Sequence, residues 1–164
     1  MILGMSVALF TQLHVYISLI GIAAGAVMAF GLVTSRSFSQ WTALFLATTI
    51  LTSATGFLFH SEAIGPPHVV GAISLVVLAV AAYALYARHL AGAWRAAYVV
   101  AALLALYLNC FVGVVQAFQK LPALHDLAPN GSEPPIAIAQ LVVLAAFALL
   151  GYRSLRRFRP SAAA

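Results

Sequence analysis

Five long apolar segments, almost free of charge, constrain this chain more than any other feature of its sequence. They run over residues 7–33, 41–59, 68–86, 94–118 and 136–152. A helix needs about 20 apolar residues to cross the hydrocarbon core of a bilayer, and each segment approaches or exceeds that length. Soluble domains carry roughly 25% charged residues, whereas this chain carries 7%. We therefore predict that lipid surrounds most of its surface.

The same segments predict the fold class. Within lipid only α-helices and closed β-barrels satisfy their backbone hydrogen bonds. Barrel strands would alternate apolar and polar residues, whereas these segments are continuous runs rich in Ala, Leu and Val. We predict a single all-α domain, an integral membrane bundle of five transmembrane helices, with a loop over residues 119–135 and a basic tail over residues 153–164.

The connections between the segments are of two kinds, which predicts the orientation. Residues 34–40 and 87–93 are short and carry arginine, whereas residues 60–67 and 119–135 are rich in proline and acid. Basic residues favour the cytoplasmic side of a membrane. With the C-terminal arginines inside, seven of the eight basic residues are cytoplasmic, all three acids are outside, and Lys120 is the exception. We predict an external N-terminus and a cytoplasmic C-terminus, which also accounts for the net charge of +5 without a nucleic-acid partner.

Four of the five histidines are predicted to share one depth. Counting about 1.5 Å per residue from the cytoplasmic ends of the segments brings three of them to the outer boundary of the hydrocarbon, and the fourth lies in the outer loop. This outer layer contains His14, His60, His68 and His125, together with the acids Glu62 and Asp126. Only His89 lies on the inner side.

Polar and small residues follow one face of three segments, in steps of three or four. These faces carry His14, Ser18, Gly21, Gly25 and Met28 on the first segment; Thr49, Ser53, Gly56 and His60 on the second; and Asn109, Gly113, Gln116 and Lys120 on the fourth. The spacing of Gly21 and Gly25 allows another helix to approach closely. Convergence of the three faces predicts a polar pocket that opens outward.

Three kinds of ligand fit this pattern. Histidines from separate helices can hold a haem b axially, with His14 and His68 the preferred pair. Imidazole and carboxylate groups can also bind a divalent transition metal. The metal set is His14, His60, His68, Glu62 and Asp126. The head group of a quinone is the third reading, since His, Tyr and Gln side chains hydrogen-bond its oxygens. The cofactor-binding set is His14, Tyr16, His68, Asn109 and Gln116.

Simpler explanations exist for each of these residues. Histidine is amphipathic and suits a membrane interface without any ligand. Gly21 and Gly25 fit simple helix packing. Asn109 and Gln116 fit hydrogen bonds between helices at least as well as a role in transport. The C-terminal arginines fit a topology signal that also contacts anionic lipid.

The stretch NCFVGVVQAFQKLPALHDLAPNGSEPP at residues 109–135, preceded by LAGAWR at residues 90–95, is similar to a family of small polytopic membrane proteins of proteobacteria. His14 and the Pro67-His68 pair also fit its pattern. The resemblance covers most of the chain and transfers no activity. It implies a location in the bacterial inner membrane, and it adds weight to His14, His68, Gln116, Lys120 and Glu133.

The sequence contains no catalytic motif, so an enzyme acting alone is not supported. We expect a small membrane binding protein or subunit whose outer pocket holds a haem, a metal or a quinone. A ligand-free structural or assembly subunit of a larger membrane complex is the alternative, and an oligomeric transporter or channel is the third. The expected partners are the lipid bilayer and other membrane subunits or further copies of this chain.

Overall fold

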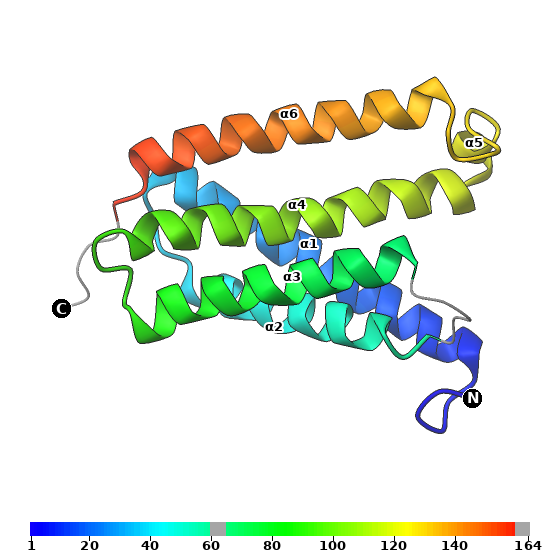
Figure 1. The fold of residues 1–164 in the computed structure, drawn as a ribbon, viewed down its shortest axis with the longest axis horizontal. Helices are drawn as coiled ribbons and strands as arrows, with labels where there is room; N and C mark the ends of the chain where they lie inside the picture. The colour runs from blue at the N-terminus through cyan, green and yellow to red at the C-terminus, as the bar shows by residue number, and fades with distance from the viewer. Residues whose placement is uncertain (60–64, 160–164) are drawn as a thin grey trace.

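A computed structural model of the protein describes residues 1–59 and 65–159, and these residues are almost entirely helical (Figure 1). Its helices are α1 (Val7–Thr34), α2 (Ser39–Gly56), α3 (Pro66–Ala82), η1 (Tyr83–Ala87), α4 (Trp94–Lys120), α5 (Pro122–His125) and α6 (Pro134–Arg157). Within the described residues, the single strand-like pairing is an isolated bridge between Ile2 and Met5. The all-α prediction is confirmed.

Each predicted apolar segment corresponds to a long helix. In the described part of the chain, four helical stretches are long and apolar enough to cross a membrane, namely Val7–Thr34, Pro66–Ala87, Ala93–Lys120 and Pro134–Arg157. The fifth, α2, falls short in apolarity because seven of its 18 residues are serine or threonine. Several boundaries differ from the prediction by two or three residues, as where α2 ends at Gly56 instead of residue 59. The largest difference is in α6, which continues through Arg157 and takes in the first residues of the expected tail. A helix need not end where the hydrocarbon ends, because arginine is a good helix former.

The long helices form a bundle in which neighbours in sequence are mostly neighbours in space. α1 packs on α2, α2 on α3, and α3 on α4, while α4 closes the group by contacting α1. α6 lies over α1 and α4, and the single turn of α5 packs on α4 (Figure 1). α1 begins at one end of the bundle and α6 finishes at the other (Figure 1). We call these the histidine end, marked by His14, His68 and His125, and the arginine end, marked by Arg36, Arg88, Arg95 and the C-terminal arginines.

A tightly packed layer separates the two ends. Phe45, Leu78 and Val99 are fully buried there. Gly25 makes this packing feasible, since a Cβ atom at its position would lie 2.5 Å from Leu106 Cδ1 and 2.9 Å from Phe45 Cδ2. The predicted role of Gly25 in close helix approach is therefore confirmed, and Gly21 likewise lies buried against threonines of α2.

Large apolar side chains cover the outside of the bundle. On α6 alone, Ile138, Leu141 and Val142 are each about three-fifths exposed. Water would penalise this surface, whereas lipid does not, because lipid tails are as apolar as the side chains. The exposed apolar surface and the four apolar helices are those of a membrane protein.

Candidate binding pocket at the histidine end

A cavity of about 130 Å³ opens between α1, α2, α3 and α4 at the histidine end. Its polar lining residues are His14, Ser18, Thr49, Thr52, Ser53, His68, Ser74 and Asn109. The three polar faces predicted from the sequence therefore meet in one place, and α3 adds a fourth. We call this cavity the histidine-end pocket.

Two hydroxyl groups in this pocket have no hydrogen-bond partner. The side chain of Thr49 is only 1% exposed, and neither its Oγ1 nor that of Thr52 is within hydrogen-bonding geometry of any donor or acceptor in the described structure. A buried hydroxyl left unpaired costs about 1–3 kcal/mol. The hydroxyl of neighbouring Thr48 is paired in the way usual for a helix, because it donates to the Leu44 carbonyl oxygen at 2.7 Å. Gln140 Oε1 and Ser154 Oγ are also buried without a partner in the described structure, but they line neither cavity. Thr49 and Thr52 do line this one, which indicates a place for a polar ligand or water.

The hydrogen bonds around His14 define which ring nitrogen carries the proton. His14 Nδ1 lies 2.9 Å from Thr55 Oγ1. We assign the single hydrogen of the Thr55 hydroxyl to the Leu51 carbonyl oxygen at 2.7 Å, and in this assignment the hydroxyl accepts from His14. Nδ1 is therefore the donor, and Nε2 of the neutral ring has a free lone pair. His14 offers the pocket an acceptor.

His68 has the opposite arrangement. It lies in the first turn of α3, where its Nδ1 accepts the backbone N–H of Gly65 at 3.3 Å. An accepting Nδ1 places the proton of the neutral ring on Nε2. His68 therefore offers a donor, and the two histidines are complementary in character. The contact with Gly65 also caps the start of α3, a structural role that needs no ligand.

Two phenylalanines that follow α2 hold the histidine rings in place. Phe59 meets the His14 ring edge-on, with ring centroids 5.2 Å apart. Phe57 packs against His68 at 5.8 Å and also against the open surface of Gly71. Aromatic contacts of this kind stabilise the fold by more than the burial of apolar surface alone. They restrict both imidazoles to one region of the pocket.

Hydrogen bonds between helices complete the wall. Ser18 donates to Asn109 Oδ1 at 2.8 Å, which links α1 to α4. Ser53 donates to the Ser74 hydroxyl at 3.0 Å, which links α2 to α3. Asn109 thus forms the interhelical hydrogen bond that the sequence suggested, and it lines the pocket at the same time.

The other predicted site residues lie elsewhere. Tyr16 is 62% exposed on the outside of α1, because residues two apart on a helix do not share a face. Gln116 is exposed and does not line the cavity. Asp126 and His125 are exposed at the end of α5. His60 and Glu62 lie outside the described residues.

The metal reading gains no support from the residues that are described. Across 1–59 and 65–159, no three side chains of His, Cys, Asp or Glu are grouped so that they could hold a metal ion. The described members of the predicted set, His14, His68 and Asp126, therefore do not form a ligand group by themselves.

Thr52 and Ser74 line the pocket, although the sequence pattern did not predict them as parts of the site. The signal for Thr52 was present, since α2 is unusually rich in Ser and Thr for a helix in an apolar chain. Ser74 had no such signal, because it is a single hydroxyl in an otherwise apolar helix. Only the packing of α3 against α2 brings it to the Ser53 hydroxyl.

The pocket can recognise a small group through hydrogen bonds. It presents an acceptor at His14 and a donor at His68, and the two unpaired threonine hydroxyls are buried in its wall. Its volume is below the roughly 300–1,000 Å³ of pockets that enclose drug-sized ligands. It therefore suits the head group of a larger molecule whose remainder lies among the helices or in lipid. Comparisons with protein families, with curated proteins and with solved structures give no match to this chain.

Proposed function

We propose that the protein crosses the bacterial inner membrane five times, with its N-terminus outside and its C-terminal arginines in the cytoplasm. The face of α2 supports counting it as the fifth span. Its hydroxyl residues point inward, as at Thr42 and Thr49, while its exposed large residues are apolar, as at Leu44, Ile50 and Leu51. A helix that is polar inside and apolar outside is suited to lipid rather than to water.

We further propose that the histidine-end pocket binds the head group of a small membrane-soluble molecule of the quinone class. The observation that carries this proposal is the pair of buried, unpartnered hydroxyls at Thr49 and Thr52. Quinone carbonyl oxygens accept hydrogen bonds, and the Thr hydroxyls and His68 Nε2–H supply donors. The Nε2 lone pair of His14 can accept the O–H of the reduced form. The pocket thus supplies partners to both forms.

Haem and metal fit the same pocket less well. Both need a free lone pair on each histidine, and His68 Nε2 carries a proton while Nδ1 accepts from Gly65. His14 alone is ready to act as a ligand. A haem is also larger than a cavity of about 130 Å³. Hydrogen bonding to an organic head group requires no change in either ring.

Quinone extraction and titration test the proposal. The purified protein is expected to carry a quinone that solvent extracts and chromatography identifies, and to bind a short-chain quinone when depleted. Thr49→Val removes one donor and is expected to weaken binding about tenfold, the equivalent of one hydrogen bond of about 1.4 kcal/mol.

Thr48→Val is the matched control, because it removes the neighbouring hydroxyl, which bonds only within its own helix. It is expected to leave quinone affinity unchanged. A quinone-free protein that also fails to bind added quinone would overturn the proposal. A haem absorbance band, or a stoichiometric metal, would replace it with one of the other two readings.

A further inference from the structure

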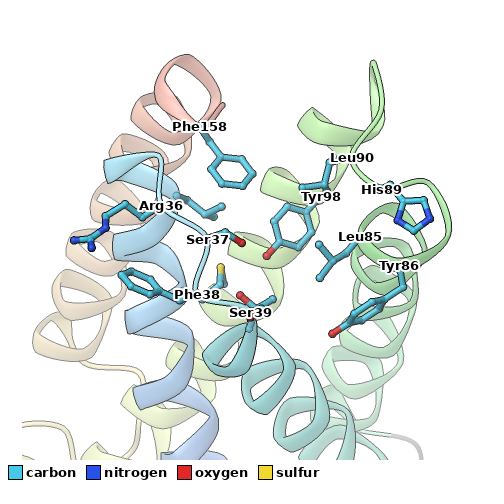
Figure 2. A pocket seen from close by; sticks show the side chains of 13 residues that line it. Arg36, Ser37, Phe38, Ser39, Leu85, Tyr86, His89, Leu90, Tyr98 and Phe158 are labelled. Atoms are coloured by element: carbon cyan, nitrogen blue, oxygen red, sulfur yellow. The ribbon is translucent and has the colours of Figure 1, made fainter. Parts of the chain in front are cut away.

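A second cavity, of about 170 Å³, lies at the arginine end (Figure 2). The loop between α1 and α2, the segment from η1 to α4, and Phe158 enclose it. We call it the arginine-end pocket. Its polar lining residues are Arg36, Ser37, Ser39, Thr42, Tyr86, His89 and Tyr98. Nothing in the proposed quinone site involves these residues, since the two cavities have no lining residue in common.

Hydroxyl groups converge in this cavity. Figure 2 shows the oxygens of Ser37, Ser39 and Tyr98 turned toward the same space. Tyr98 is 3% exposed and Thr42 is 7% exposed, and both line the cavity. Each hydroxyl carries one hydrogen that it can donate into this space. Two deeply buried residues thus present a donor to the space.

The backbone adds further donors at the same place. α2 begins at Ser39, and no side chain caps its first turn. The amide hydrogens of a first turn have no acceptor within the helix, and they attract anions. The carbonyl groups at the ends of α1 and α6 could repel an anion. Several of them are already hydrogen-bonded to backbone N–H groups or to Arg95.

The surrounding charge has one sign in the described structure. Seven of the eight basic residues lie at this end, whereas the described acids, Asp126 and Glu133, lie at the other. Arg36 stands at the rim, where its guanidinium lies 5.5 Å from the centre of the Phe38 ring and points away from the cavity (Figure 2). It supplies positive potential and not a direct contact.

The opposite wall has an irregular backbone. η1 is a π-helical turn, and His89 and Leu90 adopt positive φ angles of 47° and 58° without being glycine. Such conformations cost free energy and concentrate at binding sites. Leu85, His89 and Leu90 all line the cavity.

We infer that the arginine-end pocket binds the phosphate group of an anionic phospholipid. Free hydroxyls, uncapped amides and positive charge together select a phosphate, and the membrane supplies phospholipid at the depth where arginines and tryptophans mark the interface. The apolar lining at Met28, Leu32 and Leu85 suits the adjoining lipid chain.

Native mass spectrometry tests this inference. The protein is released from discs of phosphatidylcholine that contain a minor share of phosphatidylglycerol, and the retained lipid is counted. The wild-type protein is expected to retain phosphatidylglycerol selectively, with one tight site. Tyr98→Phe and Thr42→Val are each expected to weaken retention about tenfold, as the loss of one hydrogen bond to a charged group implies.

Matched control variants distinguish lipid binding in the pocket from attraction by the overall positive charge. Tyr152→Phe and Thr48→Val remove the same groups outside the cavity, and Arg153→Gln removes one positive charge from α6. All three are expected to retain the lipid within about twofold of the wild-type protein. Equal loss in Arg153→Gln and Tyr98→Phe, or no loss in Tyr98→Phe and Thr42→Val, would overturn the inference.

Inorganic phosphate distinguishes the two sources of the group. In discs of phosphatidylcholine alone, added phosphate is expected to give no thermal stabilisation. Stabilisation by phosphate that Tyr98→Phe abolishes, without selective lipid retention, would assign the pocket to a soluble anion and overturn the lipid assignment. Quinone binding is unaffected by either outcome, so the two proposals fail separately.

Discussion

Each end of this bundle contains a cavity, and α1, α2 and α4 contribute to both, but the two cavities are lined differently. At the histidine end the cavity is lined by side chains that pair across helices, and two threonine hydroxyls remain unpaired. At the arginine end the lining comes largely from connecting segments, with an uncapped helix start and positive charge. The first arrangement suits a neutral group that both gives and takes hydrogen bonds. The second suits an anion.

α2 links the two cavities. Thr42 lines one and Thr49 lines the other. They are seven positions apart in sequence, which is about 10 Å or nearly two turns, so both threonines lie on one face of the helix. Phe45 and Leu46 occupy the turn between them and are buried. A single helix thus places polar groups on either side of an apolar layer, which keeps the two sites distinct.

The largest expected effect comes from disturbing that layer. Gly25→Ala adds a Cβ atom within 2.9 Å of two packed side chains, Phe45 and Leu106. Overpacking of this kind typically costs about 1–3 kcal/mol, and we expect the upper part of that range. The measurement is the free energy of unfolding in mixed detergent micelles.

Gly151→Ala is the control for that substitution, because no atom lies within 4 Å of the Cβ it would add. It is expected to be neutral or to stabilise the protein by up to about 1 kcal/mol, the difference in helix propensity. Equal stability of the two variants would show that the layer between the cavities is looser than described.

An intermediate effect is expected at the arginine end. Arg95 donates to the carbonyl oxygens of Leu155 at 3.1 Å and Phe158 at 2.8 Å, which holds the end of α6 beside the cavity. Arg95→Gln removes both charge-assisted bonds and is expected to cost about 1–2 kcal/mol. Hydrogen exchange at residues 155–159 should increase, while exchange in α2 and α3 near His68 stays unchanged. Protection that is unaltered at residues 155–159 would contradict this role.

The smallest effect is expected in the loop at the histidine end. The backbone N–H of Asn130 and two further donors on Asn130 and Ser132 hold the pKa of Glu133 below its ordinary value. A lowered pKa in the folded protein means that the ionised carboxylate orders the loop above the ordinary pKa. The order is lost as the pH falls through the lowered value.

Hydrogen exchange at residues 130 and 132 measures this loss, with a correction for the intrinsic pH dependence of exchange. Glu133→Gln is expected to exchange fast at every pH, because an amide offers only one acceptor oxygen. Quinone affinity should not follow this titration, since Glu133 does not line the histidine-end pocket.

The sequence was sufficient for the helices and for much of the first cavity. Apolar length located every long helix, and steps of three and four placed His14, Ser18, Thr49 and Asn109 on faces that do converge. The same spacing rule excludes Tyr16 from the pocket, because a residue two positions from His14 does not share its helix face. Tyr16 was included because its hydroxyl can hydrogen-bond a ligand. Its position in the helix, however, places it off the face that carries His14.

Other features depend on atomic positions that no periodicity encodes. The proton positions on His14 and His68 follow from Thr55 and Gly65, whose roles appear only once the helices are packed. The arginine-end pocket arises from loops and a π-helical turn, for which the sequence has no regular pattern. Gln116 shares a face with Asn109, but it lies two turns further along α4 and does not line the pocket.

The central claim is that the histidine-end pocket is a binding site whose free hydroxyls reduce the stability of the empty protein. The most direct test is the free energy of unfolding of Thr49→Val and Thr48→Val, each with and without a short-chain quinone. We predict that Thr49→Val stabilises the quinone-free protein by about 1 kcal/mol, because it removes an unpaired buried hydroxyl, and that it loses most of the stabilisation by quinone. Thr48→Val should respond to quinone as the wild-type protein does. A Thr49→Val protein that is less stable than the wild type and keeps its full response to quinone would contradict the account.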